Sequence, residues 1–446
     1  MKVVRIVAFM ILVVPGALAQ DATPEVWNWQ FGLDARVNYR ESNRERFALM
    51  FPFEPEMLPP GAAKGWMETV DAGSSLEASL LSFSFDVEYG SMFAARAKVD
   101  TIDLYDRNPT SSDEKVDVDE LWIRFGPRPE GLELPDGTSF FFQVGKAPKM
   151  ERQPVLMLES YGLVHTAFNR MEDVQVIAGG SVGRNVYWRA QIADGSPLFF
   201  RDSNALAGDN GIPELREPFP NPRLKSGFPI LYDAETDSVF FSGSSDLLEY
   251  GTGLGYRWVS DDLARGFDLI VYYYERELAE EFDVDGTFYG GDLDLLDGIG
   301  PHSLPTEGNR KDETGARFFG EWNGGTVVAQ YVTQEMAGLG RDGWEIEAGW
   351  TFPVFFGPVT SGGTPLVTSL QPAARYSRLE HDFRGPPTYP APSVWWDWEK
   401  IDFGLVVGLY EDIELTLEHS IHNVLIPVEL DLDETLVTLR YRFRAR

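Results

Sequence analysis

Apolar and polar side chains alternate along the first and the last segments that we predict as strands. In residues 27–39 one face is apolar and largely aromatic, and its members are Trp27, Trp29, Phe31, Leu33, Ala35, Val37 and Tyr39. The last segment repeats the pattern, with Val437, Leu439, Tyr441 and Phe443 on one face and Thr438, Arg440 and Arg442 on the other. A period of two, with aromatic residues at both ends of the apolar face, is typical of a strand between lipid and water.

Similar alternation recurs between these two segments. It predicts fourteen further strands, near residues 76–89, 92–103, 116–126, 139–146, 172–181, 184–193, 251–259, 266–277, 314–323, 326–336, 343–353, 368–380, 398–410 and 412–424. The total is about sixteen, an even number, as bacterial membrane barrels require. We find no helical or solenoid repeat, so the pattern indicates a single all-β domain, a transmembrane antiparallel β-barrel.

The lengths of the predicted connections also alternate. Short ones follow the even-numbered strands, at 90–91, 182–183, 324–325 and 411, and long ones follow the odd-numbered strands, at 41–75, 147–171, 194–250, 278–313 and 381–397. The exceptions are 127–138 and 354–367, which are long, and 337–342 and 425–432, which are short. Short periplasmic turns opposite long outer loops are expected of an outer-membrane barrel. The alternative is a soluble β-sandwich, and strand length and the asymmetry of the turns favour the barrel.

The N-terminus has the pattern of a secretory signal peptide. Lys2 and Arg5 precede an apolar run over residues 6–14, and Ala17-Leu18-Ala19 forms a small-residue cleavage site before Gln20. We expect residues 1–19 to be removed and residues 20–446 to form the barrel. The alternative is an anchoring helix, but the run is shorter than the ~20 residues that a spanning helix needs.

Composition excludes several classes of function. The chain has 38 basic and 70 acidic residues and a formal net charge of -32, which argues against nucleic acid as a partner. It has no cysteine, so disulfides and thiolate metal sites are excluded. The 12 Trp, 17 Tyr and 30 Phe, beside a mean hydropathy of -0.21, fit strands of which only one face meets lipid.

Four segments together resemble the phosphate-selective porins of the porin O/P family. They are the strand-to-loop step Phe142–Pro148, the strand end Ile192–Ser196, the strand Ala374–Ser377 and the final strand Thr438–Phe443. The resemblance implies a sixteen-stranded barrel, a homotrimer, and an outer loop, here 147–171, that folds inward and narrows the pore. It would make Lys146, Lys149, Arg152 and Arg170 the basic groups of that constriction, and phosphate the solute.

Further basic residues lie on faces that we predict to line the pore. They are Arg36, Arg96, Lys98, Arg124, Arg189, Arg317, Arg375, Arg440 and Arg442. Charged rings in a narrow channel set its ion preference. The alternative is that these side chains form cross-strand ion pairs with Asp34, Asp86, Glu88, Asp100, Glu321, Glu345, Glu347, Glu414 and Glu418. The mixture of signs leaves open whether anions or cations are preferred.

Other candidate sites are weaker. The acidic stretch 280–286, with Asp292, Asp294 and Asp297, could bind Ca²⁺, although a solvated loop is favoured, and Asp117, Asp119 and Glu120 invite the same interpretation. Ser420 and His422 share a predicted face with Glu418 and could serve an esterase, but no G-x-S-x-G elbow is present. We expect no catalysis, no cofactor and no metal.

The pattern therefore predicts a porin of the bacterial outer membrane, in contact with lipid, through which small charged solutes, such as phosphate or other anions, diffuse passively. Two alternatives remain open at this point. One is a barrel enzyme of the esterase or phospholipase type, and the other is a secreted β-protein that binds carbohydrate.

Overall fold

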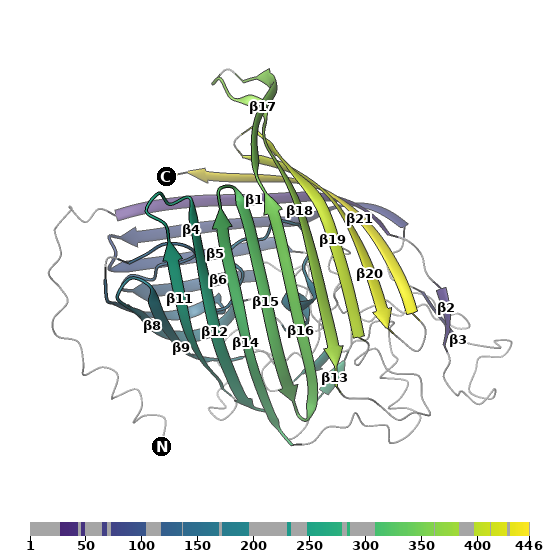
Figure 1. The fold of residues 1–446 in the computed structure, drawn as a ribbon, viewed down its shortest axis with the longest axis horizontal. Coiled ribbons are helices and arrows are strands. Elements are labelled where there is room, and N and C mark those ends of the chain that lie inside the picture. The colour runs from purple at the N-terminus through teal and green to yellow at the C-terminus, as the bar shows by residue number, and fades with distance from the viewer. Residues whose placement is uncertain are drawn as a thin grey trace.

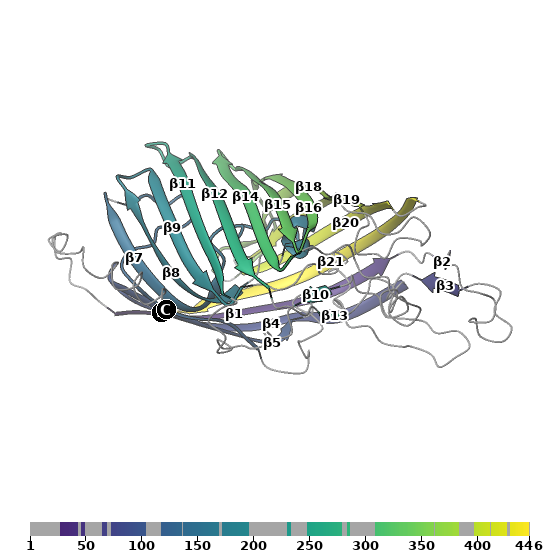
Figure 2. The same cartoon turned by 90° about the horizontal axis from the view of Figure 1, so that it is seen from below.

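The computed structural model is a closed antiparallel barrel (Figures 1 and 2). The structure describes residues 27–42, 46–49, 65–68, 73–103, 117–135, 137–168, 172–195, 230–232, 248–278, 283–285, 308–360, 362–382, 397–410, 412–425 and 429–445. Over these residues sixteen strands follow one another around the wall, and β1 closes it by pairing with both β4 and β21. The predicted all-β barrel is confirmed, and the soluble sandwich is not what the chain forms.

Each of the sixteen predicted strands is present. The first eight are β1 (Trp27–Ser42), β4 (Gly73–Tyr89), β5 (Phe93–Asp103), β6 (Asp117–Phe125), β7 (Ser139–Pro148), β8 (Glu172–Val182), β9 (Val186–Ala193) and β11 (Glu249–Val259). The others are β12 (Arg265–Glu277), β14 (Arg310–Trp322), β15 (Gly325–Met336), β16 (Leu339–Trp350), β18 (Pro365–His381), β19 (Asp397–Leu409), β20 (Ile413–Leu425) and β21 (Glu429–Ala445). Two small sheets, β2 (Arg46–Leu49) with β3 (Gly65–Glu68) and β10 (Ile230–Tyr232) with β13 (Asp283–Asp285), belong to the long connections.

The alternation of side chains is the reason for this wall. In β1 the side chains of Trp27, Trp29 and Phe31 are about half exposed on the outer face, whereas Asn38 on the other face is fully buried. Aromatic rings also contact one another on the outer face, where Trp27 lies 4.9 Å from Tyr89 between ring centroids. Such a belt of rings is expected where a membrane meets water.

The two ends of the barrel differ as the sequence predicts. Turns of few residues, such as 90–92, 183–185 and 323–324, lie at one end, and both Trp27 and Ala445 lie at that same end (Figure 1). The connection after β15 is even shorter than predicted, because it is the two-residue turn 337–338 and not 337–342. Its residue Ala337 has a φ of 51°, so a tight turn fits between the strands and β16 begins four residues earlier.

The sequence predicts a connection over residues 354–367, but the structure has a strand over the first part of it. An extra strand, β17 (Phe352–Val359), continues β16 after Thr351 and pairs with the start of β18. It projects beyond the rest of the rim (Figure 1). Residues 351–374 contain no charged side chain, and β-branched and aromatic residues extend the ladder where a loop was expected.

Wall height is uneven around the barrel. The strands β6 to β9 have 8 to 11 residues, whereas β1, β4, β18 and β21 have 16 or 17. The long connection after β7 carries one helical turn, α2 (Leu163–Ala167). Among the described residues, no helix is long and apolar enough to span a membrane.

Candidate functional site

The connection that follows β7 folds into the barrel. Its helix α2 packs against the inner side of β16 and β18, and the ring of Phe168 lies 4.5 Å from the guanidinium of Arg341. Met157 and Leu158 form a small buried apolar cluster with Ala373 of β18. We call residues 149–168 the inward loop. The resemblance to porins O and P implied that residues 147–171 fold inward; Arg170, one of the basic groups expected there, lies outside the described residues.

Two glutamates of the wall hold the backbone of the inward loop. Glu347 of β16 accepts the N–H groups of residues 157 and 158 through one carboxylate oxygen, both at 2.9 Å. Glu418 of β20 accepts those of residues 159 and 160, at 2.9 and 3.2 Å. Charged acceptors make the stronger class of hydrogen bond, so these carboxylates fix the path of the loop.

Glu345, on the same face of β16 as Glu347, holds the two flanks of this segment. Its carboxylate accepts from the side-chain amide of Gln153 at 2.9 Å and from the backbone N–H of Val164 at 3.3 Å. Gly162 lies so close that an added Cβ would be 1.6 Å from the Glu345 carboxylate. A side chain at position 162 would therefore require the Glu345 carboxylate or the loop to move.

Basic side chains of the wall hold the loop carbonyls. Arg375 of β18 donates to the carbonyl oxygen of Ser160 at 2.8 Å and forms an ion pair with Asp402 at 2.8 Å. Lys400 of β19 donates to the carbonyl oxygen of Tyr161 at 2.7 Å. We call Glu345, Glu347, Arg375, Lys400, Asp402 and Glu418 the latch. All six are buried, so Arg375 lies behind the loop and not at the surface of the lumen.

Beyond the latch the inward loop also contacts β21 and β1, the strands that follow β20 around the wall. Glu159 forms ion pairs with Arg36 at 3.2 Å and with Arg440 at 3.3 Å. Burial alone would raise the pKa of Glu159, but Arg36 and Arg440 outweigh it, so its pKa is lowered. Asp34 of β1 is the second anion beside Arg440. These contacts hold the loop against consecutive strands on one side of the barrel, from β16 round to β1.

A cavity of about 580 Å³ remains beside the inward loop. Over the described residues, three acidic side chains line it, Glu120, Glu130 and Asp268, against ten basic ones: Arg36, Arg96, Arg128, Lys149, Arg152, Arg189, Arg257, Arg317, Arg440 and Arg442. The sign of this lining is opposite to the net charge of -32 of the whole chain. Part of the acid on the predicted pore face is used in the latch. Five of the ten lining cations also pair with acids that do not themselves line the cavity: Arg36, Lys149, Arg152, Arg440 and Arg442.

Three of the arginines stack on two aromatic rings. Arg189 lies 4.8 Å from the ring of Phe141 and 4.8 Å from that of Tyr187, while Arg257 lies 4.9 Å from Tyr187. Arg128 lies 5.4 Å from the ring of Phe141. In the described part of the chain no carboxylate lies within ion-pair distance of Arg189. The faces of the two rings stabilise its charge in place of a carboxylate. Arg189 is therefore a positive charge at the cavity that no carboxylate of the described residues pairs with directly.

Eight of the thirteen residues predicted from the sequence line this cavity. Of the others, Lys98 forms an ion pair with Asp100 at 3.3 Å, and Arg124 lies 3.8 Å from Glu130. Lys146 shares the outer face of β7 with Phe142, as the register against Leu121 shows, so it does not line the cavity. The alternation in residues 139–146 was therefore sufficient to place Lys146 on the outer face from the sequence alone.

The prediction missed Arg128 and Arg257. Arg257 lies between Tyr256 and Trp258, and both aromatic neighbours belong to the opposite face of β11, so the period of two was sufficient to place it inside. Arg128 follows β6 in the connection 126–138, where no alternation indicates direction.

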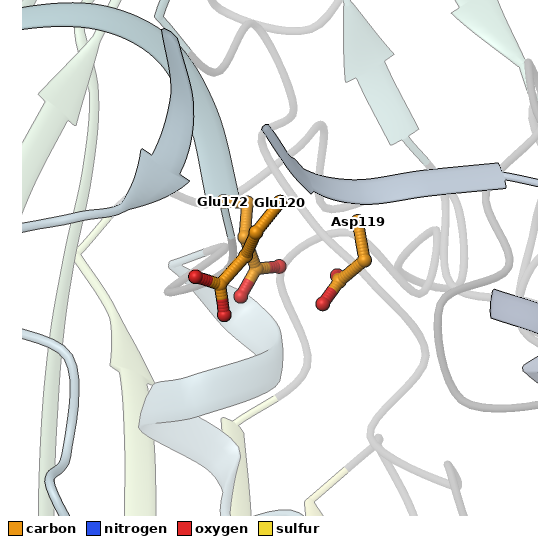
Figure 3. Close-up of side chains that lie close together, drawn as sticks. All are labelled: Asp119, Glu120 and Glu172. Atoms are coloured by element: carbon orange, nitrogen blue, oxygen red, sulfur yellow. The ribbon is translucent and has the colours of Figure 1, made fainter. Parts of the chain in front are cut away.

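Three carboxylates meet beside the loop, those of Asp119, Glu120 and Glu172 (Figure 3). Their ligand atoms lie within 4.8 Å of one another, as a metal site would require. However, Lys98 donates to Asp119 and Arg152 pairs with Glu172, so two cations already neutralise the cluster. The proposed calcium stretch 280–286, with Asp292, Asp294 and Asp297, falls almost wholly outside the described residues, as does the side chain of Asp117.

The serine and histidine of the enzyme alternative are buried and face other partners. Ser420 donates from its hydroxyl to Asp402 at 2.5 Å. His422 accepts from the indole of Trp398 at 3.2 Å and lies 3.5 Å from Glu434. Both side chains are fully buried, and neither lines the cavity beside the inward loop.

Comparison with solved structures identifies the kind of fold. The outer-membrane channel DcaP of Acinetobacter baumannii matches 96% of this chain and 100% of its own, at 9% identity and a TM-score of 0.51. The chain has the fold of outer-membrane channels. Two other solved structures also match. OmpF of Salmonella typhi has 11% identity and a TM-score of 0.47, and the match covers 94% of this chain and 98% of OmpF. An anion-selective porin from Comamonas acidovorans has 8% identity and a TM-score of 0.45, and the match covers 94% of this chain and 100% of that porin. No family model matches the sequence, and no curated protein matches it significantly.

Proposed function

We propose that the protein is a diffusion channel of the bacterial outer membrane that prefers small anions. The observation that carries this proposal is the lining of the cavity beside the inward loop, with ten basic and three acidic side chains among the described residues. A narrow passage between walls of low dielectric concentrates the effect of such charges, and it raises the local concentration of the counter-ion.

The acidic excess of the chain does not oppose this preference. Charges beyond a Debye length of about 8 Å in physiological salt are largely screened, so acids on distant outer surfaces contribute little to the field at the constriction. The latch carboxylates are buried and bonded to loop N–H groups and to Arg375. The cavity is governed by the groups that line it.

Three finer points belong to the same proposal. Phosphate is a suitable solute, because guanidinium groups bind its oxygens in pairs. Residues 1–19 would direct export and be cleaved. The resemblance to porins O and P suggests a homotrimer, with lipid around the remaining outer wall.

The test is a salt gradient across a planar bilayer that contains the purified, refolded protein. We expect discrete channel openings and a reversal potential of the sign that chloride permeation gives. Arg189→Gln should move the reversal potential toward that of potassium, because it removes a charge with no acidic partner.

The matched control is Arg378→Gln on the outer face of β18, where Arg378 pairs with Glu380 and Glu399. It removes the same charge away from the cavity and should leave selectivity unchanged. A potassium-selective wild type would refute the anion preference, and a folded barrel that never conducts would refute the channel itself.

A further inference from the structure

The connection between β6 and β7, residues 126–138, also turns into the barrel, from the end opposite to the inward loop. Arg257 of β11 donates to the carbonyl oxygen of Glu133 at 2.7 Å. Leu132 covers Gly266 of β12 so closely that an added Cβ would be 3.0 Å from its Cδ1. These contacts place the connection across the inner face of strands that are not its neighbours in the wall.

Glu130 stands at the tip of this connection and lines the cavity. One oxygen of its carboxylate lies 3.8 Å from Arg124 and 3.5 Å from Arg128. The side chain is 65% exposed, so water of the lumen reaches it although protein surrounds it. Burial alone would raise the pKa of Glu130, but Arg128 and Arg124 outweigh it and lower the pKa, so the group is charged near neutral pH.

We propose that Glu130 is a tethered counter-ion, whose carboxylate occupies an oxyanion subsite at Arg124 and Arg128 and must be displaced by a passing anion. The inference deepens the proposed function and rests on it. A carboxylate presents to a guanidinium the same negative oxygens as a small free oxyanion. Because Glu130 is mostly exposed, its pairs with the arginines are of the weak kind that a solute can replace.

The consequence concerns how fast a bound anion leaves. Conduction requires a site that attracts the ion but does not retain it. A carboxylate fixed on the connection 126–138 returns to the arginines as soon as the solute moves on. Glu130 therefore lowers the affinity of the cavity for anions and speeds their passage.

The experiment measures the inorganic phosphate concentration that halves the chloride conductance of single channels, in wild type and in Glu130→Gln. Removing the competitor, whose carboxylate is the exposed partner of both ion pairs, should lower this concentration by about two- to tenfold. Glu133→Gln is the matched control, since Glu133 lies on the same connection, is exposed, and has no ion pair among the described residues. Its carboxylate accepts the backbone N–H of Glu130 at 3.5 Å, which the amide oxygen of glutamine can also accept. It should leave the concentration unchanged.

A second variant keeps the result interpretable. Adding Arg128→Gln to Glu130→Gln should reverse the gain, because the freed subsite loses a guanidinium. If Glu130→Gln binds phosphate like the control while wild type is anion-selective, the tethered counter-ion is refuted and the proposed function stands. If wild type prefers cations, both fall together. If Glu130→Gln folds but no longer conducts, Glu130 shapes the connection and the proposal is overturned.

Discussion

Replacing Glu418 with alanine should release the inward loop from the wall. The change removes the acceptor of two backbone N–H groups, at residues 159 and 160, and of the Ser160 hydroxyl. A buried donor that loses its acceptor costs about 1–3 kcal/mol. Water from the neighbouring cavity can reach the loop once it lifts, so we take about 1 kcal/mol for each donor and about 3 kcal/mol for the three.

This magnitude is large enough to be seen in two assays. At 1.4 kcal/mol for each factor of ten, the ratio of closed to open loop should fall by about a hundredfold. We expect a higher mean conductance with more open-channel noise, and faster tryptic cleavage after Lys149 or Arg152 in proteoliposomes. Cleavage follows the population of the open form when opening and closing are fast.

Glu414→Ala is the matched control. Glu414 lies on the same face of β20 as Glu418, four residues before it in the chain. It pairs with Arg442 at 3.1 Å and not with the loop backbone. It should keep wild-type noise and cleavage rate, although selectivity can change. If Glu418→Ala is cut as slowly and conducts as quietly as Glu414→Ala, the latch does not hold the loop as argued.

Two further variants probe the same loop. The pKa of Glu159 is lowered below its usual 4.5, so its contribution is complete above pH 4.5 and is lost as the pH falls through the lowered value. Wild type should show a rise in conductance and noise below about pH 4.5 that Glu159→Gln lacks, measured as the difference between their pH profiles; identical profiles would contradict the role of Glu159. Gly162→Ala should displace the loop, because the added Cβ would be 1.6 Å from the Glu345 carboxylate, and its noise should exceed that of Gly137→Ala, where nothing lies within 4 Å. Equal noise in the two glycine variants would mean that the loop adjusts without leaving the wall.

The fold was predictable because lipid and water impose opposite demands on neighbouring residues. In β1 and β21 this demand alone places Arg36, Arg440 and Arg442 inside and the aromatic residues outside. The same reasoning could have placed Arg257 inside. The number of strands could be counted from the same alternation, because each strand of the wall has one face toward lipid and one toward the inside. The strands must close into a barrel, since an unpaired sheet edge is too costly in lipid.

The electrostatics of the site were not predictable in this way. Whether an inward arginine is neutralised depends on partners distant in sequence, such as Glu159 with Arg440. The latch is invisible in a sequence because it holds the loop mainly through backbone N–H and C=O groups, which nearly every residue possesses. The inward course of 126–138 likewise depends on contacts with β11 and β12, which no local pattern records.

The unequal strands have a consequence for the surrounding membrane. At about 3.3 Å per residue and a tilt of about 40°, an eight-residue strand such as β9 rises only about 20 Å, less than the apolar band of about 25 Å. Strands of 17 residues, such as β18, exceed that band. By the same arithmetic only β6 and β9 among these short strands fall below the band, so the bilayer must become thinner beside them, at a fraction of a kcal/mol for each Å of mismatch. Two barrels that met along their low walls would share one thinned zone in place of two, so the lipid would favour that side for any contact between copies.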